Sequence, residues 1–491
     1  MIINSQTSSR SQGYSPGLRT ALVLTGIGTA GAYHAGVLRA FREAGVKIDL
    51  IAGCGVGAVG ALFTAVDGGQ RLWEAAGLWD TKDSRSLYRW KRSLEFSAAM
   101  FYALIGLLTA PLVLLAAALL VYPAGFFLSL VGVPSGNEIL VWYGQLLGEV
   151  FSPGVLPTFL PRLVTILVIV FIGVFLFGQF GSRRHIRRRT NGASWWRVLG
   201  SPLDSSLTVR RFTRGLWSLI RGAAAQSEVT PIELSRRYSE LLRENLGQPG
   251  FCEVIMVAHD LDARRDLVFA LLGDFYHRPF FRGQQDKRGR SNREIEVVDL
   301  GRSGQDHVVD ALSACLSVPI ANEPHLMAFK SESYWRGETH RVSDRSESVV
   351  RLLAEVAESG VEQVIVVSAS PRSAGPHGLG SEPLNPRRRL GENLAAAESA
   401  AIRDALTAQR HRFRNIFRIQ PVHNAVGPFD FSGCYDERSD RVQTLRELLD
   451  WGSDDAYRQF IEPILGASGE RLQTANSETV NRTNETTEKS L

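Results

Sequence analysis

The start of the chain contains two short apolar runs, and each is followed by a glycine-rich turn and an Ala- and Val-rich segment. The first run, Thr20–Leu24, leads into a helix that we expect to end near Ala44. The second run is mostly apolar, covers Val46–Ala52, and leads into another helix after its own glycine turn. Short buried strands that alternate with helices are typical of a parallel sheet covered on both faces. The pattern therefore predicts a three-layer α/β domain.

The C-terminal part of the chain is helical by pattern. Further helices are expected at 394–409, 442–451 and 456–464, in a C-terminal extension that should pack on the same domain.

Two longer apolar stretches interrupt the α/β pattern. The chain has no charged residue between Glu95 and Glu138, and the first expected span lies there, at about 97–122, with Pro111 as a kink. The second expected span lies at about 160–180 and is uncharged from 163 onward. A membrane-spanning helix needs about 20 such residues, and neither stretch has the polar stripe of a core helix. We therefore expect a transmembrane helical hairpin inserted into the α/β domain.

Basic residues lie mainly on one side of this expected hairpin. Several precede the first span and five arginines follow the second within 183–189, whereas the linking segment 123–161 has neither Lys nor Arg. The positive-inside rule then places both flanks, and both termini, in the cytoplasm. Ala124–Val133 and Ile139–Leu147 are too short to span, and are expected in the membrane interface.

Composition narrows the choice of chemistry. The chain has 491 residues, a net charge of +5 and four scattered cysteines without C-x-x-C spacing, which argues against a zinc site or a disulfide framework. We expect no metal and no cofactor. No nucleic-acid-binding motif accompanies the arginine cluster, so its expected contacts are anionic lipid headgroups. The polar ends, 1–17 and 467–491, are expected to be disordered.

Two motifs near the start of the chain resemble those of a known family. They are Gly31-Ala-Tyr-His-Ala-Gly-Val-Leu38 and Asp49-Leu-Ile-Ala-Gly53, and they match the family's motifs in order and spacing. The chain resembles the patatin-like phospholipase family over roughly 18–95 and 195–375. Further along, Val257–Asp262 and Gln363–Pro371 resemble two of the family's strands, and Asp310–Pro319 resembles its proline-containing helix. The resemblance implies the family's three-layer fold with a mainly parallel sheet, here in two parts, 18–95 and 183–375. The inserted hairpin, 96–182, separates them, and the helical extension, 376–466, follows them.

The resemblance also implies a site, from which this chain departs. The family uses a serine–aspartate dyad with the serine at the centre of a G-x-S-x-G elbow, but here that segment reads Gly53-Cys54-Gly55-Val56-Gly57. Gly55 therefore stands at the nucleophile position. The family's aspartate follows the proline-containing helix, and at that place Tyr334-Trp-Arg-Gly-Glu338 puts Arg336. Glu338 comes two residues late.

The remaining site residues belong to the family's oxyanion loop. In this loop Ile27 replaces the middle glycine and Ala30 replaces the basic residue, and the residues expected to bind an anion are Gly26, Gly28, Thr29 and Gly31. Gly55 should lie at the tip of its turn with positive φ, near Gly28 and near the Trp335–Glu338 turn.

The departures favour a membrane-anchored pseudo-hydrolase that binds membrane lipids, anionic headgroups or a protein partner without cleaving esters. Helix N-termini at the two glycine turns attract anions, and Arg336 would make the cleft more positive. The alternative is that Arg336 pairs with Glu338 or Asp344 at the surface.

Two other functions stay open. An active lipid acyl hydrolase would need a non-standard nucleophile, for which Cys54 is the candidate. Cys54, however, has Ala52 and Val56 where an elbow nucleophile needs small residues, and we expect it to be packed in the core. A dinucleotide-binding protein is formally consistent with Gly26-x-Gly28-x-x-Gly31 after a strand, although Asp49 begins the second strand instead of ending it.

Overall fold

The computed structural model describes residues 13–74, 77–79, 82–155, 158–182, 201–222, 227–282, 295–331, 333, 335–371 and 385–466. The chain divides into two compact units, one formed by 1–89 with 204–491 and the other by 90–203. The second unit is wider than the expected hairpin because β3 (Arg89–Trp90) pairs with β4 (Leu203–Asp204) at its base. The predictions for 1–12, 183–189 and 467–491 lie outside the described residues.

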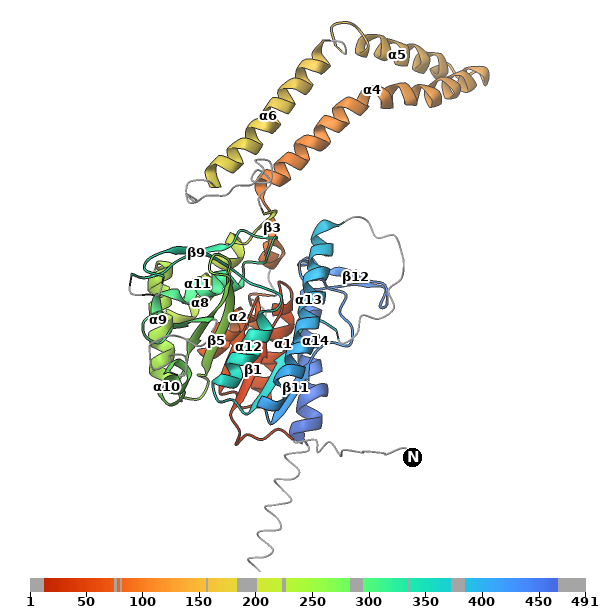
Figure 1. The fold of residues 1–491 in the computed structure, drawn as a ribbon. Coiled ribbons are helices and arrows are strands. Elements are labelled where there is room, and N and C mark those ends of the chain that lie inside the picture. The colour runs from red at the N-terminus through yellow and green to blue at the C-terminus, as the bar shows by residue number, and fades with distance from the viewer. Residues whose placement is uncertain are drawn as a thin grey trace, which may run out of the picture. The chain divides into compact units, whose positions relative to one another are not determined.

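A nine-stranded sheet forms the centre of the first unit (Figure 1). Its main path is β11-β10-β1-β2-β5-β6-β7, and the strands from β11 to β5 are parallel. The hairpin of β8 and β9 joins this sheet through an antiparallel pairing of β9 with β5. The predicted, mainly parallel sheet is therefore confirmed. Its strands are β1 (Thr20–Leu24), β2 (Leu50–Gly53), β5 (Glu253–Asp260), β6 (Arg265–Leu271), β7 (Ile295–Asp299), β8 (His325–Ala328), β9 (Thr339–Ser343), β10 (Gln363–Val367) and β11 (Asn415–Ile419).

Helices cover both faces of the sheet, as alternation of side chains along β1 requires. Ala21 and Val23 belong to an apolar cluster shared with α12 (Ser348–Glu358) and α13 (Pro386–Gln409). Leu24 points the other way and contacts α2 (Gly57–Ala65). The three-layer architecture is thus confirmed. The remaining described elements of this unit are α1 (Ala30–Glu43), α3 (Gln70–Trp73), η1 (Lys82–Ser86), α8 (Ser206–Ile220), α9 (Pro231–Asn245), α10 (Asp274–Arg282), η3 (Gln305–His307), α11 (Val308–Cys315), η4 (Arg410–Arg412), β12 (Cys434–Asp436), β13 (Arg441–Gln443), α14 (Leu445–Ala456) and η5 (Tyr457–Gly466).

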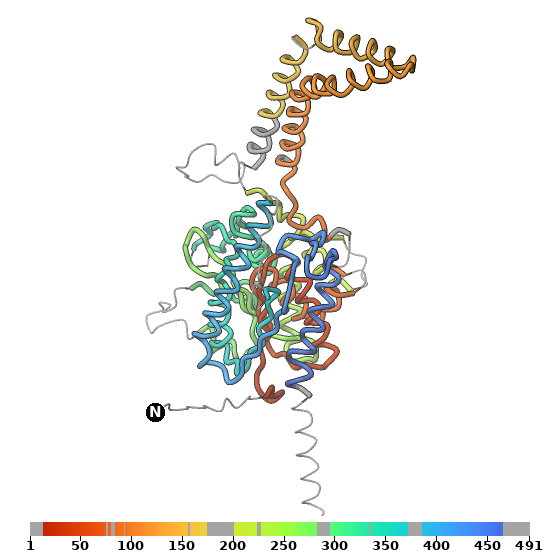
Figure 2. The backbone as a smooth tube through the Cα atoms, turned by 90° about the vertical axis from the view of Figure 1, so that its right-hand side faces the viewer, coloured from red at the N-terminus to blue at the C-terminus, as the bar shows by residue number. Residues whose placement is uncertain are grey.

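The C-terminal helix α14 packs against α1 at backbone distance. A Cβ atom added to Gly36 would lie 1.8 Å from the carbonyl oxygen of Leu449, and one added to Gly452 would lie 2.2 Å from that of Tyr33. In Figure 2 the blue C-terminal helices lie beside the red start of the chain. Only glycine at both positions permits this approach, so the C-terminal extension is part of the α/β unit's core.

The expected disorder of 1–17 does not hold for its last five residues. Tyr14 is buried, its ring contacts Phe460 edge-on with centroids 5.5 Å apart, and its hydroxyl donates to the carbonyl of Lys47 at 3.0 Å. The polar composition of the segment hid this single aromatic anchor.

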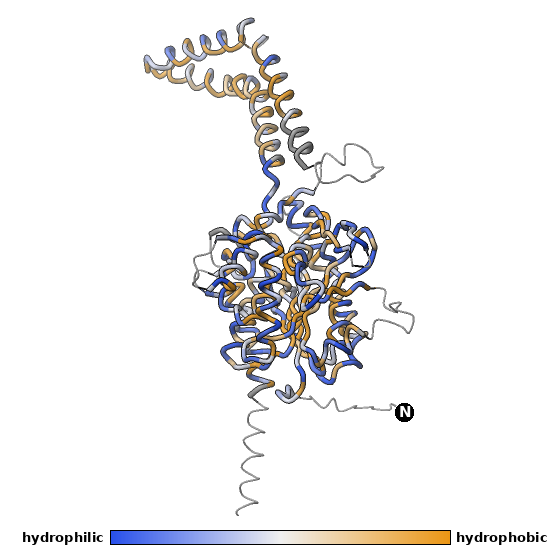
Figure 3. The backbone as a smooth tube through the Cα atoms, turned by 90° about the vertical axis from the view of Figure 1, so that its left-hand side faces the viewer, coloured by the Kyte–Doolittle hydropathy of each residue, from blue (hydrophilic) through white to orange (hydrophobic). Residues whose placement is uncertain are grey.

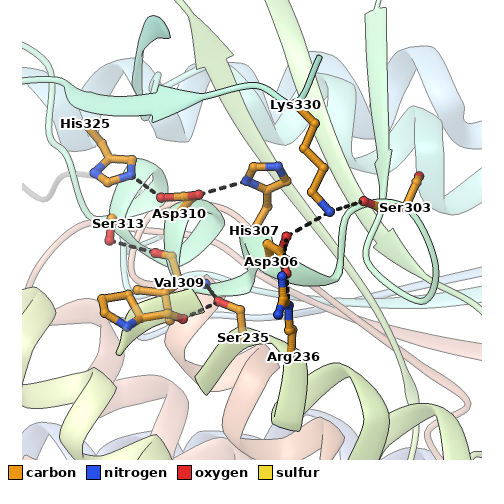
Figure 4. A network of polar contacts seen from close by, with 11 residues as sticks. Ser235, Arg236, Ser303, Asp306, His307, Val309, Asp310, Ser313, His325 and Lys330 are labelled. Atoms are coloured by element: carbon orange, nitrogen blue, oxygen red, sulfur yellow. Dashed lines mark hydrogen bonds and ion pairs between the residues drawn. The ribbon is translucent and has the colours of Figure 1, made fainter. Parts of the chain in front are cut away.

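A polar network at the edge of the β8–β9 hairpin joins α9, η3, α11 and β8 (Figure 4). Asp310 accepts hydrogen bonds from His307 Nδ1 at 2.8 Å and from His325 Nε2 at 2.7 Å. Burial alone would raise the pKa of Asp310, but these two hydrogen bonds outweigh it and lower the pKa to about 2. Asp306 forms a second centre beside it by pairing with Arg236 and Lys330. The network holds the start of α11 against α9 and β8, which is a structural role.

The inserted unit consists of long helices. α4 (Arg92–Leu130) has 39 residues and is therefore about 58 Å long, with Pro111 and Pro123 inside it. α5 (Ser135–Val150) folds back on α4, where the Tyr143 hydroxyl donates to the carbonyl of Leu114. α6 (Phe159–Ser182) also packs on α4. Figure 3 shows α4 coloured mostly as hydrophobic.

One helix among the described residues is long and apolar enough to cross a membrane. It is α4, over Leu94–Leu130, which contains the first expected span, 97–122. The second expected span, 160–180, lies on α6. The part of α6 whose side chains are described, Phe159–Gly173, is a shorter apolar helix, and the side chains of 174–180 lie outside the described residues. The transmembrane hairpin is therefore not confirmed.

Candidate functional site

The turn between β2 and α2 has the geometry of an elbow. Gly55 has a φ of +57°, a conformation that glycine adopts readily and other residues adopt with strain, so the predicted positive φ is confirmed. Gly53 and Gly57 on either side let α2 start close to the strands, since a Cβ on Gly57 would lie 2.0 Å from the carbonyl oxygen of Leu24. Gly55 itself offers no side-chain oxygen or sulfur.

The carboxyl group of Asp344 faces Gly55. A Cβ added to Gly55 would lie 3.0 Å from Asp344 Oδ2 and 2.2 Å from the carbonyl oxygen of Gly26. Asp344 directly follows β9, is buried, and donates its backbone N–H to the carbonyl of Ser317 at 2.9 Å. A carboxyl group therefore does lie beside the elbow, although sequence reasoning missed it.

Arg336 does not occupy the position expected for it. It lies in the turn between β8 and β9, is exposed, and has a φ of +46°. β9 has five residues and so spans about 17 Å, which separates the Trp335–Glu338 turn from Asp344 and from the elbow. The Trp335–Glu338 turn, where the aspartate was expected, is the tip of the hairpin formed by β8 and β9. The carboxyl group that faces the elbow belongs to Asp344, which follows the second strand of this hairpin. Tyr334 lies outside the described residues.

The glycine loop after β1 is in contact with a distant part of the chain. The backbone N–H of Thr29 donates to the carbonyl of Pro428 at 3.0 Å, and its hydroxyl donates to the carbonyl of Gly427 at 2.9 Å. Gly28 has a φ of +57°, and a Cβ there would lie 1.9 Å from the Pro428 oxygen. No sequence signal pointed to this contact, because it joins segments about four hundred residues apart.

The N–H groups at both helix starts are hydrogen-bonded within the chain. Val56, the first residue after the elbow's centre, donates its N–H to the carbonyl of Gly26 at 2.8 Å. In elbow hydrolases the N–H of this residue helps to bind the oxyanion. On α1 the N–H of Thr29 is taken by Pro428 and that of Gly31 by the carbonyl of Gly28. Of the residues expected to bind an anion, Gly26, Gly28, Thr29 and Gly31, two therefore already have an acceptor for their N–H within the chain, Thr29 and Gly31.

Three aromatic rings pack together beside the glycine loop, where a Cβ on Gly28 would lie 3.3 Å from Phe431 Cζ. The ring of Tyr88 stacks on Phe431, with centroids 5.9 Å apart, and contacts Phe429 at 5.7 Å. Its hydroxyl donates to the carbonyl of Leu316 at 2.9 Å, and burial raises its pKa. All three rings are buried.

The interior of the site is polar and lacks a cationic partner. Glu398 on α13 is buried beside Gly26, where a Cβ would lie 3.8 Å from Glu398 Oε1 and 3.9 Å from His34 Cε1. Burial raises the pKa of Asp344 to about 8 and that of Glu398 to about 7, and it lowers the pKa of His34 to about 4. Within the described ranges no Lys or Arg forms an ion pair with either carboxyl group.

Cys54 is packed in the apolar cluster between the sheet and α12–α13, as expected of a core residue. Burial raises the pKa of its thiol well above the usual value. In the part of the chain that the structure describes, no group of His, Cys, Asp and Glu is arranged to hold a metal ion.

Comparison with known proteins identifies one family. A family profile described as "Patatin-like phospholipase" matches residues 22–339. No curated protein sequence matches the chain. Among solved structures, VipD from Legionella pneumophila is similar at 11% identity and a TM-score of 0.28, over 92% of this chain and 67% of VipD. A likeness at that TM-score supports no statement about this chain.

Proposed function

The chain belongs to the patatin-like phospholipase family, and we propose that it is a membrane-anchored member that does not cleave acyl esters. The family name points to lipids as the molecules this fold handles. In this chain the elbow and its surroundings favour a structural role for the former active site.

The observation that carries this proposal is that the elbow has no nucleophile and that the N–H groups around it already donate to carbonyls of the chain. Ester cleavage in this geometry needs a nucleophile at the turn and N–H donors aimed at the developing oxyanion. Gly55 supplies no nucleophile, and the N–H groups of Val56 and Thr29 donate to the carbonyls of Gly26 and Pro428. An acyl group would have to displace both carbonyls before it could bind.

Asp344 does not compensate for the missing nucleophile. With a pKa of about 8, its carboxyl group is mostly protonated at pH 7 and is a poor base for a water molecule. A base accepts a proton only in its ionised form, which is the minor form of this carboxyl group at that pH.

The alternatives find less support. Hydrolysis through Cys54 would need a thiolate, whereas this thiol is buried among apolar side chains with a raised pKa. Dinucleotide binding would need the glycine loop to approach a pyrophosphate, whereas Pro428 lies against that loop at Gly28.

Active-site probes test this proposal on the full chain in detergent. We expect no labelling by a fluorophosphonate, which reacts with activated hydroxyl groups. We also expect no labelling of Cys54 by iodoacetamide at pH 7.5. The partly exposed Cys434 serves as the internal positive control for the thiol reagent. Stoichiometric fluorophosphonate labelling would instead reveal an activated nucleophile and overturn the proposal.

For the membrane we propose that α4 is one crossing and that 160–180 supplies the other. The apolar side chains of α4 face solvent, and none of its best window is buried, which supports a lipid environment. The basic flanks support a cytoplasmic α/β unit and contacts with anionic lipids.

A cysteine introduced at Ser152, between the two proposed crossings, tests this topology. In intact cells a membrane-impermeant maleimide should label Ser152→Cys, because the linking segment is expected outside. The same reagent should leave Ser303→Cys, at an exposed position of the α/β unit, unlabelled until the cells are lysed. Equal labelling of both positions in intact cells would contradict the two-crossing topology.

A further inference from the structure

Two carboxyl groups lie buried on either side of Gly26, on different elements. Asp344 follows β9 and approaches Gly55, and Glu398 projects from α13 toward Gly26. The atoms Asp344 Oδ1 and Glu398 Oε1 are buried without a hydrogen-bond partner among the described residues. Burial raises both pKa values and outweighs the hydrogen bonds from Gly55, Arg345 and Ser348 to Asp344 and from Thr25 to Glu398, which favour the charged forms. A buried carboxyl group without a cationic partner holds its proton to a higher pH than it would in water.

The loop 424–433, which we call the cap loop, packs on the glycine loop next to these carboxyl groups: a Cβ on Gly28 would lie 1.9 Å from the Pro428 oxygen and 3.3 Å from Phe431 Cζ. It is held together by its own hydrogen bonds, such as that from the N–H of Gly427 to Asp430 Oδ2 at 3.0 Å. It is fixed to the rest of the unit by Pro428 on the glycine loop, by Phe429 and Phe431 on Tyr88, and by Asn424, which donates to the carbonyl of Ala369. The cap loop contains no helix or strand, whereas Asp344 directly follows β9 and Glu398 lies on α13.

We propose that the cap loop is a proton-dependent closure of the former active site. It stays closed while Asp344 and Glu398 carry protons, and it is released as they ionise and draw in water. This inference rests on the proposed function, because it treats the covered elbow as a closed site.

The groups that face the two carboxyls provide no charge that would cancel this effect. His34 on α1 is neutral, with a pKa of about 4, and the thiols of Cys54 and Cys315 and the phenol of Tyr88 have raised pKa values. The two nearest arginines bind elsewhere: Arg345 pairs with Asp266 and Glu347, and Arg387 lies over Phe429, near Asp430.

The direction of the pH effect follows from the raised pKa values. Closure is most stable below pH ~4, where both carboxyl groups are protonated in the closed and open states alike. It weakens as the pH rises, up to about 7 for Glu398 and about 8 for Asp344. Each carboxyl that must hold a proton to close lowers the closure constant about tenfold per pH unit in that window.

Hydrogen exchange on the full chain in detergent tests the proposal. After correction for the intrinsic pH dependence of exchange, opening of 424–433 should increase at least about tenfold per pH unit between pH 5.5 and 7. Peptides from β10 serve as the reference and should not change in the same way. Equal behaviour of the cap loop and β10 would overturn the proposal.

Neutral variants isolate the two carboxyl groups. Glu398→Gln and Asp344→Asn each keep the shape of the protonated group, so each should reduce the slope and keep the cap loop closed at pH 8. Glu392→Gln, on the exposed side of the same helix, is the matched control and should retain the wild-type slope. A wild-type slope in both neutral variants would contradict the proposal. Exchange needs no turnover, so ester cleavage by a protein with a pH-dependent cap loop would contradict the proposed function alone.

Discussion

Gly452→Ala and Gly36→Ala are each expected to lower the free energy of unfolding by about 3 kcal/mol or more, at the upper end of the overpacking range. A Cβ at either position would lie 2.2 Å or less from a backbone carbonyl oxygen of the facing helix. Backbone atoms cannot rotate away as the end of a flexible side chain can. Relief therefore requires α1 and α14 to move apart, which disturbs the contacts along both helices.

Thermal and denaturant unfolding of the detergent-purified protein measures this effect. Gly17→Ala is the control, because its nearest neighbour atom would lie 3.7 Å from the new Cβ, an ordinary contact. A loss below about 1 kcal/mol in both helix variants would mean that the two helices are not packed at backbone distance.

Gly55→Ser, the change that returns a hydroxyl to the elbow, is expected to give no ester cleavage and to destabilise the protein by about 2–3 kcal/mol. The new Cβ would lie 2.2 Å from the carbonyl oxygen of Gly26, which already accepts the N–H of Val56. The serine would have to push the glycine loop outward against Pro428. It would also take on the left-handed backbone conformation.

Gly55→Ala is the matched variant, since it adds the same Cβ without the hydroxyl. The two variants should lose equal stability, and neither should release fatty acid. Arg336→Asp combined with Gly55→Ser should add nothing, because Arg336 is at the far end of β9 from the elbow. Turnover by the serine variant but not by the alanine variant would show that the elbow is open and only the nucleophile is missing.

The parts of the fold that follow from local pattern were predicted from the sequence. Thr20–Leu24 and the glycine turn near Gly55 lie where expected, because short apolar runs and glycines with positive φ are local properties. The first apolar span also lies inside one long helix. Tyr14 was missed because one aromatic residue in a polar segment produces no periodic signal.

The site was predicted less well because its decisive contacts are distant in sequence. The acid was sought in a turn directly after the α11 region, but a hairpin intervenes and the carboxyl group belongs to Asp344. The alternating segment Thr339–Ser343 followed by Asp344 is the pattern of a strand that ends in a polar residue, and it could have located the acid.

The contacts of Pro428 and Glu398 with the glycine loop left no such pattern. Pro428 contributes a backbone carbonyl, which every residue has. Glu398 lies on a helix whose sequence pattern is polar and typical of an exposed helix. The loop's expected affinity for anions was inferred from free N–H groups, whereas those of Thr29 and Gly31 donate to carbonyls within the chain. A closed site of this kind is visible only once the chain is folded.

The central claim is that the chain does not cleave acyl esters, and fatty-acid release from phospholipid vesicles measures it directly. Detergent-purified wild-type protein should release no more fatty acid than vesicles alone at any pH from 5 to 9, at any protein concentration. Release that rises in proportion to the protein and disappears in Asp344→Asn would contradict the account, because it would mean that this carboxyl group still serves a working nucleophile.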